Sequence, residues 1–463
     1  MSTESAVFLS GNLMRHVVRM SLTTSIGLMA MFAVDLVDLI FISMLGNDAL
    51  AAAVGYAGSL LFFTNAINIG FSIAAGSLVA RAIGAGRGEE AREYATSVGL
   101  YAALTGIVLP LLILSQVESI LSLFGAEGEV LALAARYVCF VVPSMWMVGV
   151  AMTAMAVLRA HGDARRSMMA TLYGGTVNAV LDPILIFGLD FGLDGAALAS
   201  VAARLAMLLC AALPLIRVYR GFAKPGLALM LRDATAIGGM AAPAVMTNIA
   251  TPVGNAIVTR EIAQFGTEAV AGMAIISRLM PVAFSVIFAL SGAIGPIIGQ
   301  NFGAGQYARV RRGFVAGVQF AGFYIVLVSA LLFLLRSPIA DLFDATGITR
   351  ELVYLFCGVL ALAGFFNGVI FVANASFNNL GHPLYSTWIN WGRHTLGTWP
   401  LAIVGAHMAE AQGVLFGQAV GGIFFALIAW LLALRVMRTS AEQTPEEESE
   451  PPLATPMLHR RGW

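Results

Sequence analysis

Charged residues are scarce in this sequence, since Asp, Glu, Lys and Arg make up only 11% of its 463 residues. A soluble domain carries about 25% charged residues, so this composition excludes an ordinary soluble protein. Hydrophobic residues account for 59% of the chain, which is typical of an integral membrane protein. The 26 basic residues balance the 26 acidic ones, so the net charge gives no reason to expect a nucleic-acid partner.

Cysteine is rare as well, and Cys139, Cys210 and Cys357 lie in apolar runs without paired spacing, so buried thiols are expected and no disulfide. The six histidines are scattered without the spacing of metal ligands, and no metal site is expected. Two Gly-Ala-Gly segments, 84–86 and 303–305, lack the Lys-Ser/Thr continuation of a phosphate-binding loop and are interpreted as turns. The sequence therefore predicts no enzyme and no cofactor.

Apolar runs of about twenty residues or more predict helices that cross a membrane, because such runs are too long for the strands of an outer-membrane barrel. The fold class expected is an all-α integral membrane protein. Its twelve predicted spans are 20–44, 54–80, 94–115, 133–157, 168–188, 195–216, 238–259, 268–298, 314–335, 351–373, 384–405 and 413–436.

Basic residues gather on one side of the predicted membrane. The loops on the side of the N-terminus hold most of the arginines, whereas the opposite loops hold only Arg136, Arg260, Arg336 and Arg350. Cytoplasmic loops are enriched in Lys and Arg. We therefore predict a multi-pass protein of the inner cell membrane with both termini in the cytoplasm.

The chain contains an internal duplication. Four short segments recur at offsets of 220, 219, 219 and 218 residues. The pairs are 45–52 with 265–272, 83–87 with 302–306, 160–167 with 379–386, and 194–200 with 412–418. Each copy holds six predicted spans and so returns the chain to its starting side, which predicts two six-helix bundles related by a pseudo-two-fold axis along the membrane normal.

The repeat also suggests the domain boundaries. We assign 1–216 to the N-terminal bundle, 217–233 to a cytoplasmic linker loop and 234–438 to the C-terminal bundle. Residues 439–463 are acidic and rich in proline, and a disordered cytoplasmic tail is expected there. A cleft between two such bundles is typical of transporters that work by alternating access.

Acidic residues inside the predicted spans are the strongest functional signal. Asp35 and Asp38 are three residues apart in the first span and lie on one helix face. In the fifth span, Asn178 and Asp182 also share a face, and Pro183 follows directly. Asp38 and Asp182 each lie eight residues before the next outer loop, which puts both about 12 Å below the outer surface. Intramembrane acids at one depth usually mark an ion or proton pathway.

The second copy lacks these acids, since Ile257 or Val258 and Leu401 occupy the corresponding positions. Ion chemistry is therefore expected in the N-terminal bundle alone. Arg204 is interpreted as a structural contact to a carbonyl or an acid. Arg278 and Arg393, in the eighth and eleventh spans, either make structural ion pairs or line the cleft.

Several motifs in order resemble the multidrug and toxic compound extrusion (MATE) transporters across about residues 15–438: "DLIFISMLGNDALAA", the two "GAG" loops, "VLRAHGDAR", "NAVLDPILIFGLDFGLDGAALAS" and "ANASFNNLGHPLYST". The resemblance implies two bundles around a V-shaped cleft. It places the family's essential acid on Asp38, its amide and second acid on Asn178 and Asp182, and a neighbouring hydroxyl on Ser200. The NorM-type branch carries a glutamate near the position of Thr251. This sequence has none there, so it resembles the DinF-type branch instead. Asp35 stands where an amide is more usual.

The sequence and the resemblance together predict a secondary antiporter. It would export amphipathic, cationic drugs or toxic compounds in exchange for protons or sodium ions, as a monomer in the lipid bilayer. The predicted coupling residues are Asp38, Asp182, Asn178, Asp35 and Ser200, and the candidates for the substrate cleft are Arg278, Arg393 and Tyr137. A lipid-linked saccharide flippase with the same two-bundle plan stays an alternative.

Overall fold

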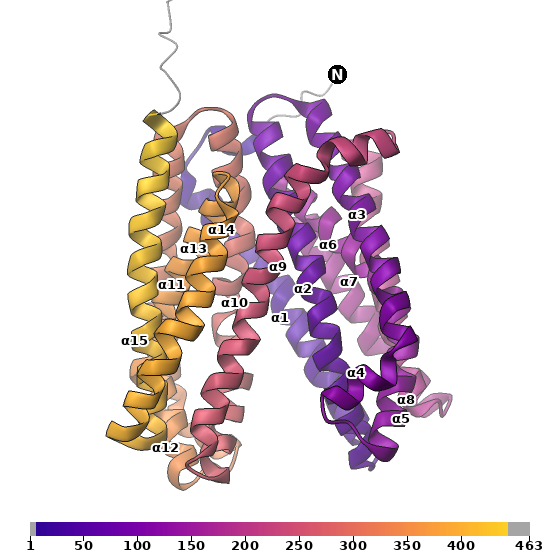
Figure 1. The fold of residues 1–463 in the computed structure, drawn as a ribbon, viewed down its shortest axis with the longest axis vertical. Helices are drawn as coiled ribbons and strands as arrows, with labels where there is room; N and C mark the ends of the chain where they lie inside the picture. The colour runs from indigo at the N-terminus through magenta and orange to yellow at the C-terminus, as the bar shows by residue number, and fades with distance from the viewer. Residues whose placement is uncertain (1–5, 443–463) are drawn as a thin grey trace, which may run out of the picture.

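The computed structural model describes residues 6–442, whose regular elements are all helical (Figure 1). The first half consists of η1 (Val7–Leu9), α1 (Leu13–Ser43), α2 (Asp48–Gly84), α3 (Gly88–Ser115), α4 (Val117–Leu123), α5 (Gly128–Val141), η2 (Val142–Ser144), α6 (Met145–Ala160), α7 (Ala164–Pro183), η3 (Ile184–Gly188), α8 (Gly192–Pro214) and η4 (Leu215–Tyr219). The second half consists of α9 (Leu227–Ala263), α10 (Thr267–Gly303), α11 (Tyr307–Leu342), α12 (Gly347–Leu355), η5 (Phe356–Leu360), α13 (Ala361–Asn379), α14 (Pro383–Gly392), η6 (Arg393–Thr398) and α15 (Trp399–Glu442).

The twelve predicted crossings are confirmed. Ten helical stretches within the described residues are long and apolar enough to span a membrane. The last of them, Pro383–Glu442, contains a break at Ala409 and Glu410 and therefore makes two crossings. The twelfth crossing is α9, whose 37 residues match α2 in length but include several Gly, Thr, Asn and Pro residues, which lower its hydropathy. The predicted tail, 439–463, lies outside the described residues except for its first four positions, which continue α15.

The helices form two lobes, which we call the N-lobe (α1–α8) and the C-lobe (α9–α15). Both ends of the described chain and the connection between η4 and α9 lie at one end of the molecule, which we call the linker end (Figure 1). The lobes lie close together there and diverge toward the opposite end, where α4, α5 and α12 lie (Figure 1).

The closest approach of the lobes reproduces the internal repeat. A Cβ atom added to Gly84 would lie 2.0 Å from the carbonyl oxygen of Gln300, and one added to Gly303 would lie 2.0 Å from that of Arg81. Gln300 and Gly303 come 219 residues after Arg81 and Gly84, which is the offset of the repeat. Equivalent backbone segments of α2 and α10 thus pack on each other across the pseudo-two-fold axis, and only glycine leaves room for this contact.

Polar contacts between the lobes reinforce the linker end. Ser77 of α2 donates a hydrogen bond to the carbonyl of Asn378 (3.0 Å), and Gln300 of α10 donates to that of Ala160 (2.8 Å). Ser97 of α3 donates to the buried carboxylate of Asp233 in α9 (2.6 Å). These bonds join the lobes near the ends of their helices that lie toward the linker.

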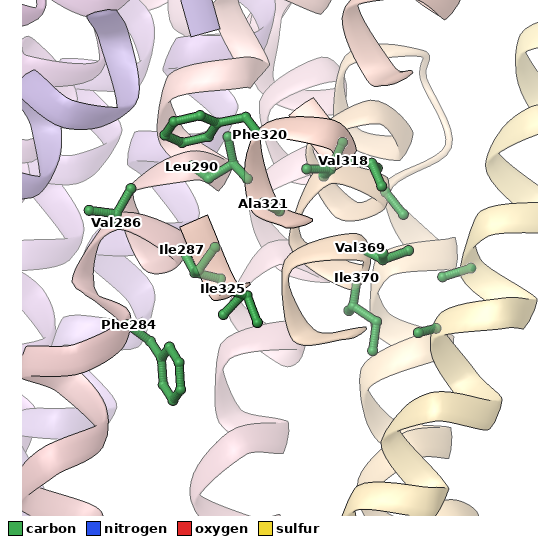
Figure 2. Packing of buried hydrophobic residues seen from close by; sticks show 14 of the residues in the cluster. Phe284, Val286, Ile287, Leu290, Val318, Phe320, Ala321, Ile325, Val369 and Ile370 are labelled. Carbon is green, nitrogen blue, oxygen red and sulfur yellow. The ribbon is translucent and has the colours of Figure 1, made fainter. Parts of the chain in front are cut away.

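The apolar cores differ between the lobes. In the C-lobe, one continuous core joins α10, α11 and α13, with residues such as Phe284, Ile287 and Ile370 packed together (Figure 2). In the N-lobe the apolar residues form two separate clusters, one around α2, α3 and α6 toward the linker end and one around α5 and the opposite half of α2. Polar side chains of α1, α7 and α8 occupy the region between these two clusters.

Candidate functional site

The polar region of the N-lobe is centred on two carboxyl groups from packed helices, Asp38 of α1 and Asp182 of α7. Asp182 is 1% exposed, and its carboxylate accepts a hydrogen bond of 2.9 Å from the amide of Asn178, one turn earlier. The carboxyl groups of Asp38 and Asp182 lie within hydrogen-bonding reach of each other. Two carboxyl groups can bond in this way only when a proton lies between them.

Apart from Asn178, no donor among the described residues is found for this pair. Oδ1 of Asp38 and Oδ1 of Asp182 are both buried, and no N–H or O–H group of the described residues reaches them. Within residues 6–442, neither carboxylate forms a salt bridge to a basic side chain. Unpaired acceptor oxygens of this kind are suited to bind a proton or a small cation.

The local sequence explains how α7 presents its acid. Proline cannot donate the hydrogen bond of a regular helix, and α7 ends at Pro183, directly after Asp182. A π-helical turn, η3, continues the crossing. Such turns are frequent at functional sites because they loosen the helical hydrogen-bond pattern. Pro183 was expected to kink the helix. In the structure the α-helix changes there to a π-helical turn, directly after Asp182.

Asp35 differs from Asp38 in its surroundings. Its side chain is exposed, although it interacts electrostatically with the carboxyl group of Asp38 one turn later. The three-residue spacing thus makes the two acids neighbours, while only Asp38 faces Asp182. The structure brings together Asp38, Asp182 and Asn178, and it leaves Asp35 at the edge of the group.

Tyr137 and Ser200 extend this group within the N-lobe. Tyr137 is buried, and its hydroxyl lies within hydrogen-bonding reach of Ser200 and interacts electrostatically with Asp38 and Asp182. Arg204, one turn after Ser200, donates to the carbonyl of Val141 (2.7 Å), which is the carbonyl contact expected from the sequence. Tyr137, a candidate for the substrate cleft, therefore lies beside the predicted coupling residues.

The two candidate arginines of the C-lobe form no salt bridge with the carboxyl pair in the part of the chain that the structure describes. Arg278 is exposed on α10, whereas Arg393 is 8% exposed at the start of η6. Arg393 donates hydrogen bonds to Oδ1 of Asn367 and to Nε2 of His394, each 2.7 Å long. Neither Asn367 nor His394 was predicted as a site residue, although a polar residue within a predicted span is a signal that could have identified each of them.

Comparisons with known proteins agree with this architecture. An FAD transporter of Shewanella oneidensis is 28% identical over 439 residues, covering 92% of this chain and 96% of that protein. The multidrug export protein MepA of Staphylococcus aureus is 26% identical over 361 residues, covering 76% and 78%. A variant of the Vibrio cholerae MATE transporter VcmN matches in structure with a TM-score of 0.88 at 25% identity, covering 93% of this chain and 99% of that one.

The two halves are also recognised separately. The MatE family model matches residues 23–184, which lie in the N-lobe, and residues 243–404, which lie in the C-lobe. The matched segments begin 220 residues apart and together make up more than half of the chain. The protein therefore belongs to the MatE family, the multidrug and toxic compound extrusion transporters.

Proposed function

We propose that this chain is a secondary antiporter that exports amphipathic, cationic compounds in exchange for protons or sodium ions. Membership of the family makes it a transporter of small molecules in a membrane. The carboxyl pair of Asp38 and Asp182 is the observation that carries the exchange. One chain contains both lobes, so a monomer is the functional unit of the proposal.

The pair supports ion exchange for an electrostatic reason. Two carboxylates side by side in a medium of low dielectric constant repel each other, and a proton or a sodium ion between them removes the repulsion. Asn178 holds Asp182 in place, while Ser200 and Tyr137 supply further oxygen atoms nearby. These oxygens suit a proton or sodium ion, so the identity of the ion is left to experiment.

Helix α1 offers a route from the ion to the lobes. Its first turns, including Leu13, Val17 and Met20, belong to the apolar core of the C-lobe, whereas Asp38 near its other end faces α7 of the N-lobe. A change in the bonding of Asp38 therefore acts on a helix that packs against both lobes. Such a shared element can bias the equilibrium between two arrangements of the lobes.

The exchange then runs in two steps. With the lobes apart at the end opposite the linker, the ion binds the carboxyl pair, α1 moves relative to the kinked end of α7, and the compound leaves. With the linker end open, the ion leaves, and the negative charge on the pair attracts a cationic compound. The arginine distribution predicts that the linker end faces the cytoplasm, so the cycle exports the compound.

A second candidate substrate class is anionic. The relative from Shewanella oneidensis is described as an FAD transporter, and FAD carries a pyrophosphate. Arg393 is the feature of this chain that favours such a compound, because it is buried without an acidic partner among the described residues. A lipid-linked saccharide flippase would need several such basic residues, and among residues 6–442 Arg393 is the one buried in the C-lobe.

Transport by the purified chain in sealed vesicles tests the proposal. Ethidium, an amphipathic cation, is supplied on one side, and an opposing gradient is imposed, either of protons without sodium or of sodium at equal pH. We expect one of the two gradients to drive ethidium uphill and Asp38→Asn to abolish this movement. The driving gradient identifies the ion.

Asp344→Asn is the matched control, because Asp344 is exposed in the α11–α12 connection, far along the chain from the pair. The control should transport at the wild-type rate. The antiport would be refuted if ethidium still moved uphill in Asp38→Asn at equal protein content. It would also be refuted if neither gradient drove ethidium uphill in the wild type.

A further inference from the structure

The C-lobe contains a buried arginine on an irregular helical turn. Arg393 begins η6, a π-helical turn of six residues between α14 and α15, and its side chain is 8% exposed. Gly397 of η6 packs against Gly421 in the second half of α15. A Cβ atom added to Gly421 would lie 2.5 Å from the main chain of Gly397. Close packing on that side leaves Arg393 directed toward α13, which carries Asn367.

Two neutral groups hold the guanidinium in place. Asn367 accepts through its carbonyl oxygen, and the imidazole of His394 accepts at Nε2, each at 2.7 Å. Because arginine can only donate, Nε2 of His394 carries no proton, and a neutral His394 must carry its proton on Nδ1. Both partners of the Arg393 guanidinium are thus neutral, and they orient the group without neutralising its charge.

Nothing in the described chain neutralises Arg393. Among residues 6–442 no carboxylate forms a salt bridge with it, and no acidic side chain acts on it electrostatically. A buried charge without a partner is expensive, and proteins usually pair such charges or use them to bind a ligand. The guanidinium has five N–H groups, so the bonds to Asn367 and His394 leave donors for an anion.

A glycine of α9 completes the surroundings. Gly254 passes directly over the imidazole, because a Cβ at this position would lie 1.8 Å from Nδ1 of His394. Nδ1 is buried and has no hydrogen-bond partner in the described chain. The imidazole is therefore wedged between α9 and Arg393, and its position fixes that of the guanidinium. Three helices of the C-lobe thus contribute to one rigid cationic group.

We propose that Arg393 binds an anionic oxygen group, a carboxylate or a phosphate, on compounds that this transporter moves. Asn367 and His394 are positioning residues that aim the guanidinium, and Gly254 leaves room for the imidazole. The inference rests on the proposed function in so far as the bound compound is also the exported one. It assigns to the C-lobe a recognition task that is separate from the ion site of the N-lobe.

Equilibrium binding to the purified full-length chain in lipid nanodiscs tests this proposal without any gradient. Two pairs of fluorescent probes differ in one anionic group each: rhodamine 110 carries a carboxylate that its methyl ester rhodamine 123 lacks, and riboflavin 5′-phosphate carries a phosphate that riboflavin lacks. We expect the anionic member of at least one pair to bind about tenfold more tightly, as for hydrogen bonds to a charged group. The pair that shows the preference identifies the group.

Two variants should abolish this preference for different reasons. Arg393→Gln removes the charge, whereas Asn367→Asp keeps the guanidinium and gives it an internal carboxylate that competes with the ligand. Arg350→Gln is the matched control, because Arg350 is a C-lobe arginine that already pairs with Asp341 (2.9 Å). The control should retain the preference, and the two variants should bind both members of the pair equally.

Equal affinity or no binding for both pairs in the wild type would overturn the proposal, as would a preference that persists in Arg393→Gln. These results are distinguishable from failure of the proposed antiport. Loss of the anion preference leaves gradient-driven ethidium transport intact, whereas absence of gradient-driven transport leaves the equilibrium preference intact.

Discussion

Adding one methyl group at the contact between the lobes should open the linker end. In Gly84→Ala, the new Cβ atom would lie 2.0 Å from the carbonyl oxygen of Gln300. Cβ atoms essentially never approach other heavy atoms within 3.0 Å, and here the neighbour is backbone, which cannot rotate away. Helices α2 and α10 must therefore separate by about 1 Å in the variant, against a closely packed interface.

The size of the effect follows from the cost of overpacking. Extra methyl groups in a well-packed interior cost about 1–3 kcal/mol. The strain exists only while the linker end is closed, so it raises the free energy of that state relative to one in which the lobes part there. At about 1.4 kcal/mol per factor of ten, the ratio of the two states should shift by about 5- to 150-fold.

Thiol labelling measures this shift. Ser77 is buried where α2 meets the C-lobe, so a reporter Ser77→Cys reacts only while the linker end is open. The chain is labelled in nanodiscs with a water-soluble maleimide after Cys139, Cys210 and Cys357 have been replaced by alanine. The labelling rate should rise about 5- to 150-fold in Gly84→Ala, in proportion to the open population.

Gly58→Ala is the control for this experiment. Gly58 lies on the same helix, and an added Cβ there would have no atom within 4 Å. It should leave the labelling rate unchanged. Unchanged labelling in Gly84→Ala, or an equal increase in both variants, would show that the glycine contact does not hold the linker end closed.

Three further predictions concern the ion site, the orientation and the anion site. Asp38→Asn and Asp182→Asn should each remove most ion-driven ethidium transport, and the double variant should lose little more, because residues that act as one unit are not additive; multiplicative losses would mean that the two acids act separately. In intact cells, an impermeant thiol reagent should label Asn47→Cys and not Gly88→Cys, in a chain without its native cysteines, and the reverse pattern would invert the predicted topology. Gly254→Ala should displace the imidazole of His394 and so reduce the anion preference in nanodiscs at least severalfold. An unaltered preference would show that the position of this imidazole does not affect anion binding.

The fold and the acid pair could be predicted because each leaves a strong local signal. Carboxylates are rare in apolar runs, so Asp38 and Asp182 stand out in the sequence. Counting residues to the next loop placed both at one depth, and the structure has their carboxyl groups within hydrogen-bonding reach. The repeat at a constant offset likewise predicted two similar bundles, which the two matches to the family model confirm.

Other features depend on packing between distant segments and leave no such signal. The sequence does not show that η6 is a π-helical turn, because η6 packs against α9 and the second half of α15, which are distant from it along the chain. The partners of Arg393 come from positions 26 residues earlier and one residue later. The three-residue spacing predicted that Asp35 and Asp38 share a helix face, and the distance to the outer loop matched Asp38 with Asp182, but neither showed that Asp35 would be left exposed.

The two lobes have come to carry ionisable groups of opposite sign at different places in the same repeat. At an offset of 219, Asp182 corresponds to Leu401, and Arg393 corresponds to Gly174. If the ion binds in one lobe and an anionic group binds in the other, neither ligand needs to touch the other's site, and coupling must pass through the contact between the lobes. Helix α1 packs against both lobes, and the glycine contact of α2 with α10 holds the lobes together. It follows that Gly84→Ala should weaken coupling by shifting the balance between the two arrangements while the residues of both sites stay unchanged, whereas a substitution at the carboxyl pair or at Arg393 alters a site itself.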